Sequence, residues 1–153
     1  MALVAIMLWY IVIGVLAAIG TTTITRSHFS PRVEQVFFAL LLIPVAGMYL
    51  TFIGYFGDSS ALRPELYAIA VFVGLALLGL RLPAALILGY ALHGAWDLVH
   101  EVSVHLASGS GGARQLSDIP LAYGVFCAAY DWWVAGYFVT RRSAWRSDRR
   151  RMR

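Results

Sequence analysis

Long apolar stretches alternate with short polar ones along the whole chain. The apolar stretches, which we expect to be helices, cover residues 2–20, 32–56, 64–80, 82–106 and 119–140. Each approaches or exceeds the roughly 20 residues that a helix needs to cross a bilayer. The pattern therefore predicts an all-α, polytopic membrane protein, built as a five-transmembrane-helix bundle over residues 1–140 and followed by a basic tail, residues 141–153.

Polar residues set the expected boundaries of these helices. We expect residues 21–32 to form a polar loop in which Ser30 caps the second helix and Pro31 occupies its first position. Pro44 lies inside that helix, removes one backbone donor and is expected to kink it. Asp118 and Pro120 are start signals for the last helix.

Composition supports membrane insertion. Of the 153 residues, 60% are hydrophobic and only 13% are charged, which leaves too little polar surface to cover a soluble globule of this size. The first apolar stretch lacks the positive start of a secretory signal peptide, so we expect it to stay in place as a membrane helix. Cys127 is the only cysteine, so no intrachain disulfide can form.

The basic residues predict the orientation of the bundle. All twelve are arginines, and seven of them lie in residues 141–153. A cytoplasmic tail would put Arg26, Arg32 and Arg81 inside as well, and leave only two arginines outside, which satisfies the positive-inside rule. The N-terminus is then outside, the C-terminus is cytoplasmic, and the tail touches anionic lipid headgroups. We do not expect nucleic-acid binding, because an arginine cluster directly after an apolar helix is usually topogenic.

The fourth apolar stretch, residues 82–106, contains several titratable side chains. His93, Asp97 and His100 fall within a sector of about 60° on one helix face. Counting 1.5 Å per residue from each end places His93 and Asp131 of the last helix near the same depth, about 16 Å into the bilayer. Titratable groups at that depth normally face a bundle interior and mark functional sites. The predicted cluster consists of His93, Asp97, His100, Cys127 and Asp131.

Three interpretations of this cluster stay open. His93, Asp97 and Asp131, with His100 and Cys127 as additional candidates, could bind zinc, iron or copper, because imidazole and carboxylate are suitable ligands and a cation offsets the cost of burying two carboxylates. The cluster could instead fix helix register through hydrogen bonds, with a protonated Asp131 that needs no cation. A proton or small-solute pathway would need a continuous polar route, which the third helix hardly offers.

Two functions follow. In the leading hypothesis a metal ion serves chemistry on a membrane-soluble substrate, with Asp97 and His100 as acid/base groups. In the alternative the chain is an accessory subunit of a larger membrane complex or a homo-oligomer, and the polar site only holds the helices together. Phosphate-binding loops and catalytic serine motifs are absent from the sequence, so the pattern indicates a site without indicating a reaction.

Three further acidic or basic residues have simpler explanations. Glu34 stands at the start of the second helix, where a carboxylate is favourable. Glu101 and His105 are four residues apart near the predicted outer interface, and a solvated ion pair is expected there.

The motif in residues 89–101, GYALHGAWDLVHE, followed by Pro120, Cys127 and Asp131, resembles a bacterial family of small multi-pass membrane proteins of unknown function, domain-of-unknown-function family 6010. That family's pattern is His-x2-Trp-Asp-x2-His-His, then a proline, then Cys-x3-Asp. This chain has Glu101 in place of the last histidine of the first motif. The resemblance covers roughly the C-terminal 60 residues. The resemblance implies a bacterial inner-membrane bundle and selects the same polar residues. It implies no activity.

Overall fold

The computed structural model describes residues 1–57, 59–107 and 116–151, with side chains for all of these except 105–107 and 146–151. Within those ranges the chain forms five α-helices and no strand, so the predicted all-α fold is confirmed. The helices are α1 (Ala2–His28), α2 (Pro31–Phe56), α3 (Leu62–Gly79), α4 (Pro83–Ala107) and α5 (Tyr123–Arg151). A short 3-10 helix, η1 (Ser59–Ala61), precedes α3.

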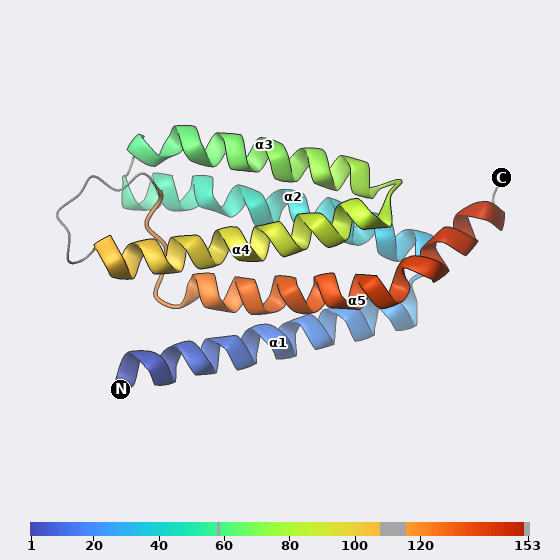
Figure 1. The fold of residues 1–153 in the computed structure, drawn as a ribbon, viewed down its shortest axis with the longest axis horizontal. Coiled ribbons are helices and arrows are strands. Elements are labelled where there is room, and N and C mark those ends of the chain that lie inside the picture. Colours follow the sequence, from blue (N-terminus) through green and yellow to red (C-terminus); the bar gives the residue numbers. More distant parts are fainter. Residues whose placement is uncertain (58, 108–115, 152–153) are drawn as a thin grey trace.

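Successive helices run in opposite directions, so α1 and α5 are parallel neighbours (Figure 1). The most extensive contacts join α4 to α5 and α1 to α5, while α2 packs on α3 and α3 on α4. The two helices with the densest polar residues, α4 and α5, therefore lie side by side between the more apolar ones. This arrangement brings the polar residues of α4 and α5 together inside the bundle.

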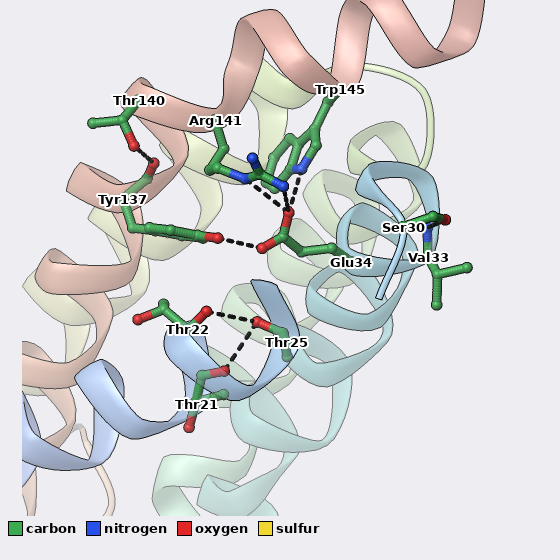
Figure 2. A network of polar contacts seen from close by, with 10 residues as sticks. All are labelled: Thr21, Thr22, Thr25, Ser30, Val33, Glu34, Tyr137, Thr140, Arg141 and Trp145. Atoms are coloured by element: carbon green, nitrogen blue, oxygen red, sulfur yellow. Dashed lines mark hydrogen bonds and ion pairs between the residues drawn. The ribbon is translucent and has the colours of Figure 1, made fainter. Parts of the chain in front are cut away.

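The first helix is longer than expected, because residues 21–28 continue α1 instead of forming a loop. Three threonines explain this correction. The hydroxyls of Thr21, Thr22 and Thr25 donate to the carbonyls of Ala17, Ala18 and Thr21 at 2.7–2.9 Å, as Figure 2 shows in part. A hydroxyl that donates back along its own helix needs no water, so a polar sequence can stay helical. The expected cap of α2 is confirmed, since the Ser30 side chain accepts the N–H of Val33.

The last helix begins and ends later than expected. Ala122 has a left-handed backbone conformation, with φ of 60°, which interrupts the chain just before α5 begins at Tyr123. Its start is capped by Glu101 of α4, which accepts the N–H groups of Ala122 and Gly124 at 3.2 and 2.9 Å. Asp118 and Pro120 therefore precede the helix, with the Pro120 carbonyl accepting the Tyr123 N–H at 3.1 Å, and α5 runs on to Arg151 through most of the basic tail.

The aromatic core lies next to the polar residues of α4. Phe38 of α2, Tyr90 of α4 and Phe138 of α5 are fully buried and pack edge to face, with ring centroids 4.9 Å apart for Phe38 and Phe138 and 5.3 Å for Tyr90 and Phe138. The Tyr90 hydroxyl donates to the Phe38 carbonyl at 2.9 Å, which satisfies its polar atom. This cluster fixes α4 and α5 one turn away from His93.

Among the described residues, three stretches are long and apolar enough to cross a membrane: Ala2–His28, Pro31–Phe56 and Ser59–Gly79, each of which contains 18 residues with a mean hydropathy of 2.7, 2.4 and 1.7, respectively. Their outer faces expose many large apolar side chains, including Leu8, Leu16 and Val71 at more than half of their area. Such surfaces suit contact with lipid rather than with water.

Replacing Gly14 with alanine is expected to destabilise the bundle by about 1–3 kcal/mol, because overpacking forces the backbone to shift. A Cβ atom at Gly14 would lie 2.4 Å from the carbonyl oxygen of Phe126, so α1 and α5 would have to separate. Gly20→Ala is the matched control, since a Cβ atom there meets nothing within 4 Å. Thermal unfolding in detergent measures both, and equal melting temperatures for the two variants would contradict the close approach.

Candidate functional site

His93, Asp97 and Asp131 form one buried group, here called the His93 site, in which each residue is at most 1% exposed. His93 Nδ1 lies 2.7 Å from Asp131 Oδ2 and 3.1 Å from Asp97 Oδ2. The first contact joins α4 to α5, so the predicted meeting of His93 and Asp131 is confirmed. One Nδ1–H group can serve only one carboxylate well, and the shorter contact favours Asp131.

Each residue of the His93 site keeps one polar atom without a hydrogen bond in the described part of the chain: His93 Nε2, Asp97 Oδ2 and Asp131 Oδ1. Buried polar atoms are nearly always paired, so three unpaired atoms in one group call for an explanation. One nitrogen or oxygen from each residue lies within 4.8 Å of the others, close enough for a single metal ion. The carboxylates and imidazole are also suitable ligands chemically.

Tyr49 of α2 completes the surroundings of this site, and sequence reasoning missed it. Its hydroxyl donates to Asp97 Oδ1, which turns the other carboxylate oxygen toward His93. Phe72 of α3 covers the imidazole, with ring centroids 4.8 Å apart. The His93 site is therefore held by four helices, α2 to α5, and Tyr49 acts as the kind of outer hydrogen-bond donor that orients a ligating carboxylate.

His100 does not join the His93 site. Its Nε2 lies 2.6 Å from Glu65 Oε1 of α3, and its Nδ1 lies 2.9 Å from the Trp96 carbonyl. Glu65 also accepts the Ser117 hydroxyl at 3.1 Å and the Trp96 indole N–H at 3.3 Å. We call Glu65, Trp96, His100 and Ser117 the Glu65 cluster. Both ring nitrogens of His100 are thus engaged with protein groups rather than turned toward Asp97.

The Tyr49 ring connects the two groups. It lies against the His100 ring, with centroids 4.2 Å apart and planes at 32°, while its hydroxyl reaches Asp97. Glu65 is fully buried, and sequence reasoning missed it because no short-range motif links it to His100, 35 residues away. A buried carboxylate in an otherwise apolar helix is the signal that could have identified it.

Cys127 lies beside the His93 site without belonging to the group of three. It is 7% exposed, and its thiol is hydrogen-bonded to Tyr123. Its place as a ligand stays a prediction.

Glu101 has a different role from the solvated ion pair that its spacing suggested. It is 3% exposed and holds the first backbone N–H groups of α5, as described above. Burial explains the correction, because the carboxylate faces α5 instead of the membrane interface. The side chain of His105 lies outside the described residues.

A further buried carboxylate, that of Glu34, lies in the first turn of α2, and Figure 2 shows its polar contacts. Glu34 of α2 is fully buried and accepts the Tyr137 hydroxyl, the Arg141 guanidinium at 2.8 and 3.0 Å, and the Trp145 indole N–H at 2.9 Å. These three donors are four residues apart on one face of α5. We call these four residues the Glu34 cluster. The cluster joins the start of α2 to α5, so Glu34 does more than favour the start of its own helix.

The sequence was compared with protein families, curated proteins and solved structures. A family model described as a family of unknown function, DUF6010, matches residues 6–144. The chain belongs to this family. The DUF6010 match covers nearly all of α1 to α3 and extends into α5, so the helices that supply Tyr49 and Glu65 are part of the shared sequence. Comparison with curated proteins and with solved structures gives no match.

Proposed function

We propose that all five helices cross the membrane, with the N-terminus outside and the C-terminus in the cytoplasm of a bacterial cell. Three helices have the required length and hydropathy. In Figure 1, α4 and α5 run beside them over much of the bundle's length. The lower hydropathy of α4 and α5 is explained by their polar side chains, which face the bundle interior at His93, Asp97 and Asp131. The ten-to-two arginine distribution supports this orientation under the positive-inside rule.

We propose further that the His93 site binds one divalent metal ion through His93, Asp97 and Asp131. The observation that carries this proposal is the unpaired, buried polar atom on each of the three residues. When both carboxylates of the site are ionised, even a protonated His93 leaves one negative charge. A divalent cation would remove this imbalance, whereas an unpaired buried charge costs several kcal/mol.

The residues fit a catalytic type of metal site better than a structural one. Three protein ligands leave a coordination position for water or substrate, as in zinc enzymes, and zinc, iron and copper all accept imidazole and carboxylate. A metal there would supply Lewis-acid or redox chemistry. Tyr49 would hold the Asp97 carboxylate in place, and Asp97 and His100 are the proposed proton-transfer groups for a membrane-soluble substrate. In the structure His100 Nε2 lies 2.6 Å from Glu65 Oε1.

Elemental analysis of detergent-purified protein tests the metal proposal. The wild type is expected to hold close to one metal ion per chain and His93→Ala almost none, while Tyr49→Phe should lower metal affinity by about 10–100-fold because an outer hydrogen bond is lost. Ser103→Ala is the matched control, since Ser103 lies on α4 outside the group of three and its hydroxyl only donates to the Val99 carbonyl of the same helix. Protein that folds normally and carries no metal would overturn the proposal.

The alternative function, a non-catalytic subunit, has one specific observation in its favour. The hydrogen bonds Tyr49–Asp97, Glu65–His100 and His93–Asp131 each join a different pair of helices, as expected if the polar residues only fix the packing. Under this alternative His93→Ala lowers the melting temperature, the wild type carries no metal, and the protein is recovered in a complex with a stoichiometric partner.

A further inference from the structure

A groove of about 780 Å³ follows the contact between α1 and α5. Its lining residues lie between positions 19 and 27 of α1 and between positions 132 and 140 of α5. Its lining changes character along its length. Arg26, Ser27 and Thr140 lie toward one end, and the indoles of Trp132 and Trp133 lie toward the other. Because α1 and α5 are parallel, both walls change from apolar to polar in the same direction.

A second groove, of about 440 Å³, continues the apolar end. It shares Trp132 and Trp133 with the first groove and is otherwise lined by aliphatic side chains from α1, α4 and α5, among them Ile11, Val15 and Leu98. Trp132 and Trp133 are 48% and 43% exposed, so the indoles form open walls rather than a closed core. The two grooves together make a surface that is cationic and hydroxyl-rich at one end and apolar over the rest.

The charge at the polar end is positive. Arg26 is exposed, and no acidic residue is among the described residues that line the first groove. The nearby carboxylate of Glu34 already accepts donors from Tyr137, Arg141 and Trp145, so it does not need Arg26 as a partner. An anion therefore complements this end, and the Arg26 guanidinium is its donor, because the Ser27 and Thr140 hydroxyls already donate to the carbonyls of Ile24 and Tyr137 at 3.0 and 2.7 Å.

We propose that this groove binds one anionic phospholipid, with its phosphate against Arg26 and one acyl chain along Trp132 and Trp133 toward Ile11. The charge complementarity and the graded polarity select this occupant. Under the proposed orientation Arg26 lies at the cytoplasmic headgroup level, where anionic lipids attract arginine. This site is separate from the His93 site, so it does not depend on a bound metal.

Native mass spectrometry of the detergent-purified protein with added dioleoyl-phosphatidylglycerol or dioleoyl-phosphatidylcholine tests the proposal. The wild type is expected to retain one phosphatidylglycerol in preference to phosphatidylcholine. Arg26→Gln should weaken phosphatidylglycerol binding by about fivefold, the effect of one arginine near anionic lipid. Arg63→Gln is the matched control, because Arg63 is an exposed arginine at the other end of the bundle, near the Tyr67 ring.

A second variant, Gly136→Leu, blocks the groove without changing its charge. Gly136 lines the groove, and a Cβ atom at this position meets nothing within 4 Å, so a side chain can begin there without a clash. We expect it to abolish retention of both lipids while metal content and melting temperature stay at wild-type values. Equal lipid retention by the wild type and both groove variants would overturn the proposal. Displacement of the lipid by inorganic phosphate alone would also overturn it, because free phosphate would then be the occupant. A dimer that only Gly136→Leu dissociates would overturn it as well, because a second copy of the chain would then be the occupant.

Discussion

Glu34→Ala is expected to lower the free energy of unfolding by about 3–5 kcal/mol, the cost of breaking a buried ion pair by removing one partner. The Arg141 side chain is only 17% exposed and would lose its one carboxylate partner within the described residues. The buried indole of Trp145 and the Tyr137 hydroxyl would lose their acceptor at the same time. Chemical denaturation in detergent, followed by circular dichroism, measures the change.

Ser143→Ala is the control for this effect, because Ser143 lies on α5 near Arg141 but is exposed. It should change the stability by less than about 0.5 kcal/mol. Glu34→Gln should fall between the two, since an amide oxygen still accepts hydrogen bonds but carries no charge for Arg141. A loss below about 1 kcal/mol in Glu34→Ala would mean that the cluster is not what fastens the end of α5 to α2.

Glu65→Ala is the second substitution with a large expected effect, again about 3–5 kcal/mol. It removes the acceptor of His100 Nε2 at 2.6 Å and of the Ser117 hydroxyl at 3.1 Å, and the His100 side chain is fully buried. The buried nitrogen of His100 would then have no partner among the described residues. Thermal and chemical unfolding in detergent measure the loss of stability.

A double-mutant cycle with His100→Ala distinguishes a specific pair from general packing. If Glu65 and His100 stabilise the fold chiefly through each other, the double variant should be less destabilised than the sum of the single variants by about 1–3 kcal/mol. Arg63→Ala, an exposed position on the same helix, serves as the control. Strictly additive effects would show that the contact contributes little.

The alternation of apolar and polar residues predicted the number of helices well, and depth counting along α4 and α5 predicted the contact between His93 and Asp131. Both inferences depend on features that are local or periodic in sequence. Helix ends were predicted less well. Threonine hydroxyls that donate back to their own helix kept α1 helical to His28, and the left-handed Ala122 delayed α5 to Tyr123.

The outer partners of the polar residues could not be predicted from sequence. Tyr49 is one tyrosine in the apolar run of α2 and lies 48 residues from Asp97 in the chain, and Glu34 meets Arg141 across 107 residues. Such pairs depend on how α2 and α3 rotate against α4 and α5, which hydrophobic periodicity alone leaves open in helices that are apolar on nearly every face. The grouping of His100 with Glu65 instead of Asp97 follows from the same rotation.

X-ray absorption spectroscopy at the edge of the bound metal, on the detergent-purified wild type, is the most direct test of the proposed metal site. Ligation by His93, Asp97 and Asp131 predicts only nitrogen and oxygen neighbours, at about 2.0–2.2 Å, with the outer scattering of a single imidazole. A sulfur neighbour at about 2.3 Å, or a second imidazole, would contradict this ligand set by bringing in Cys127 or His100.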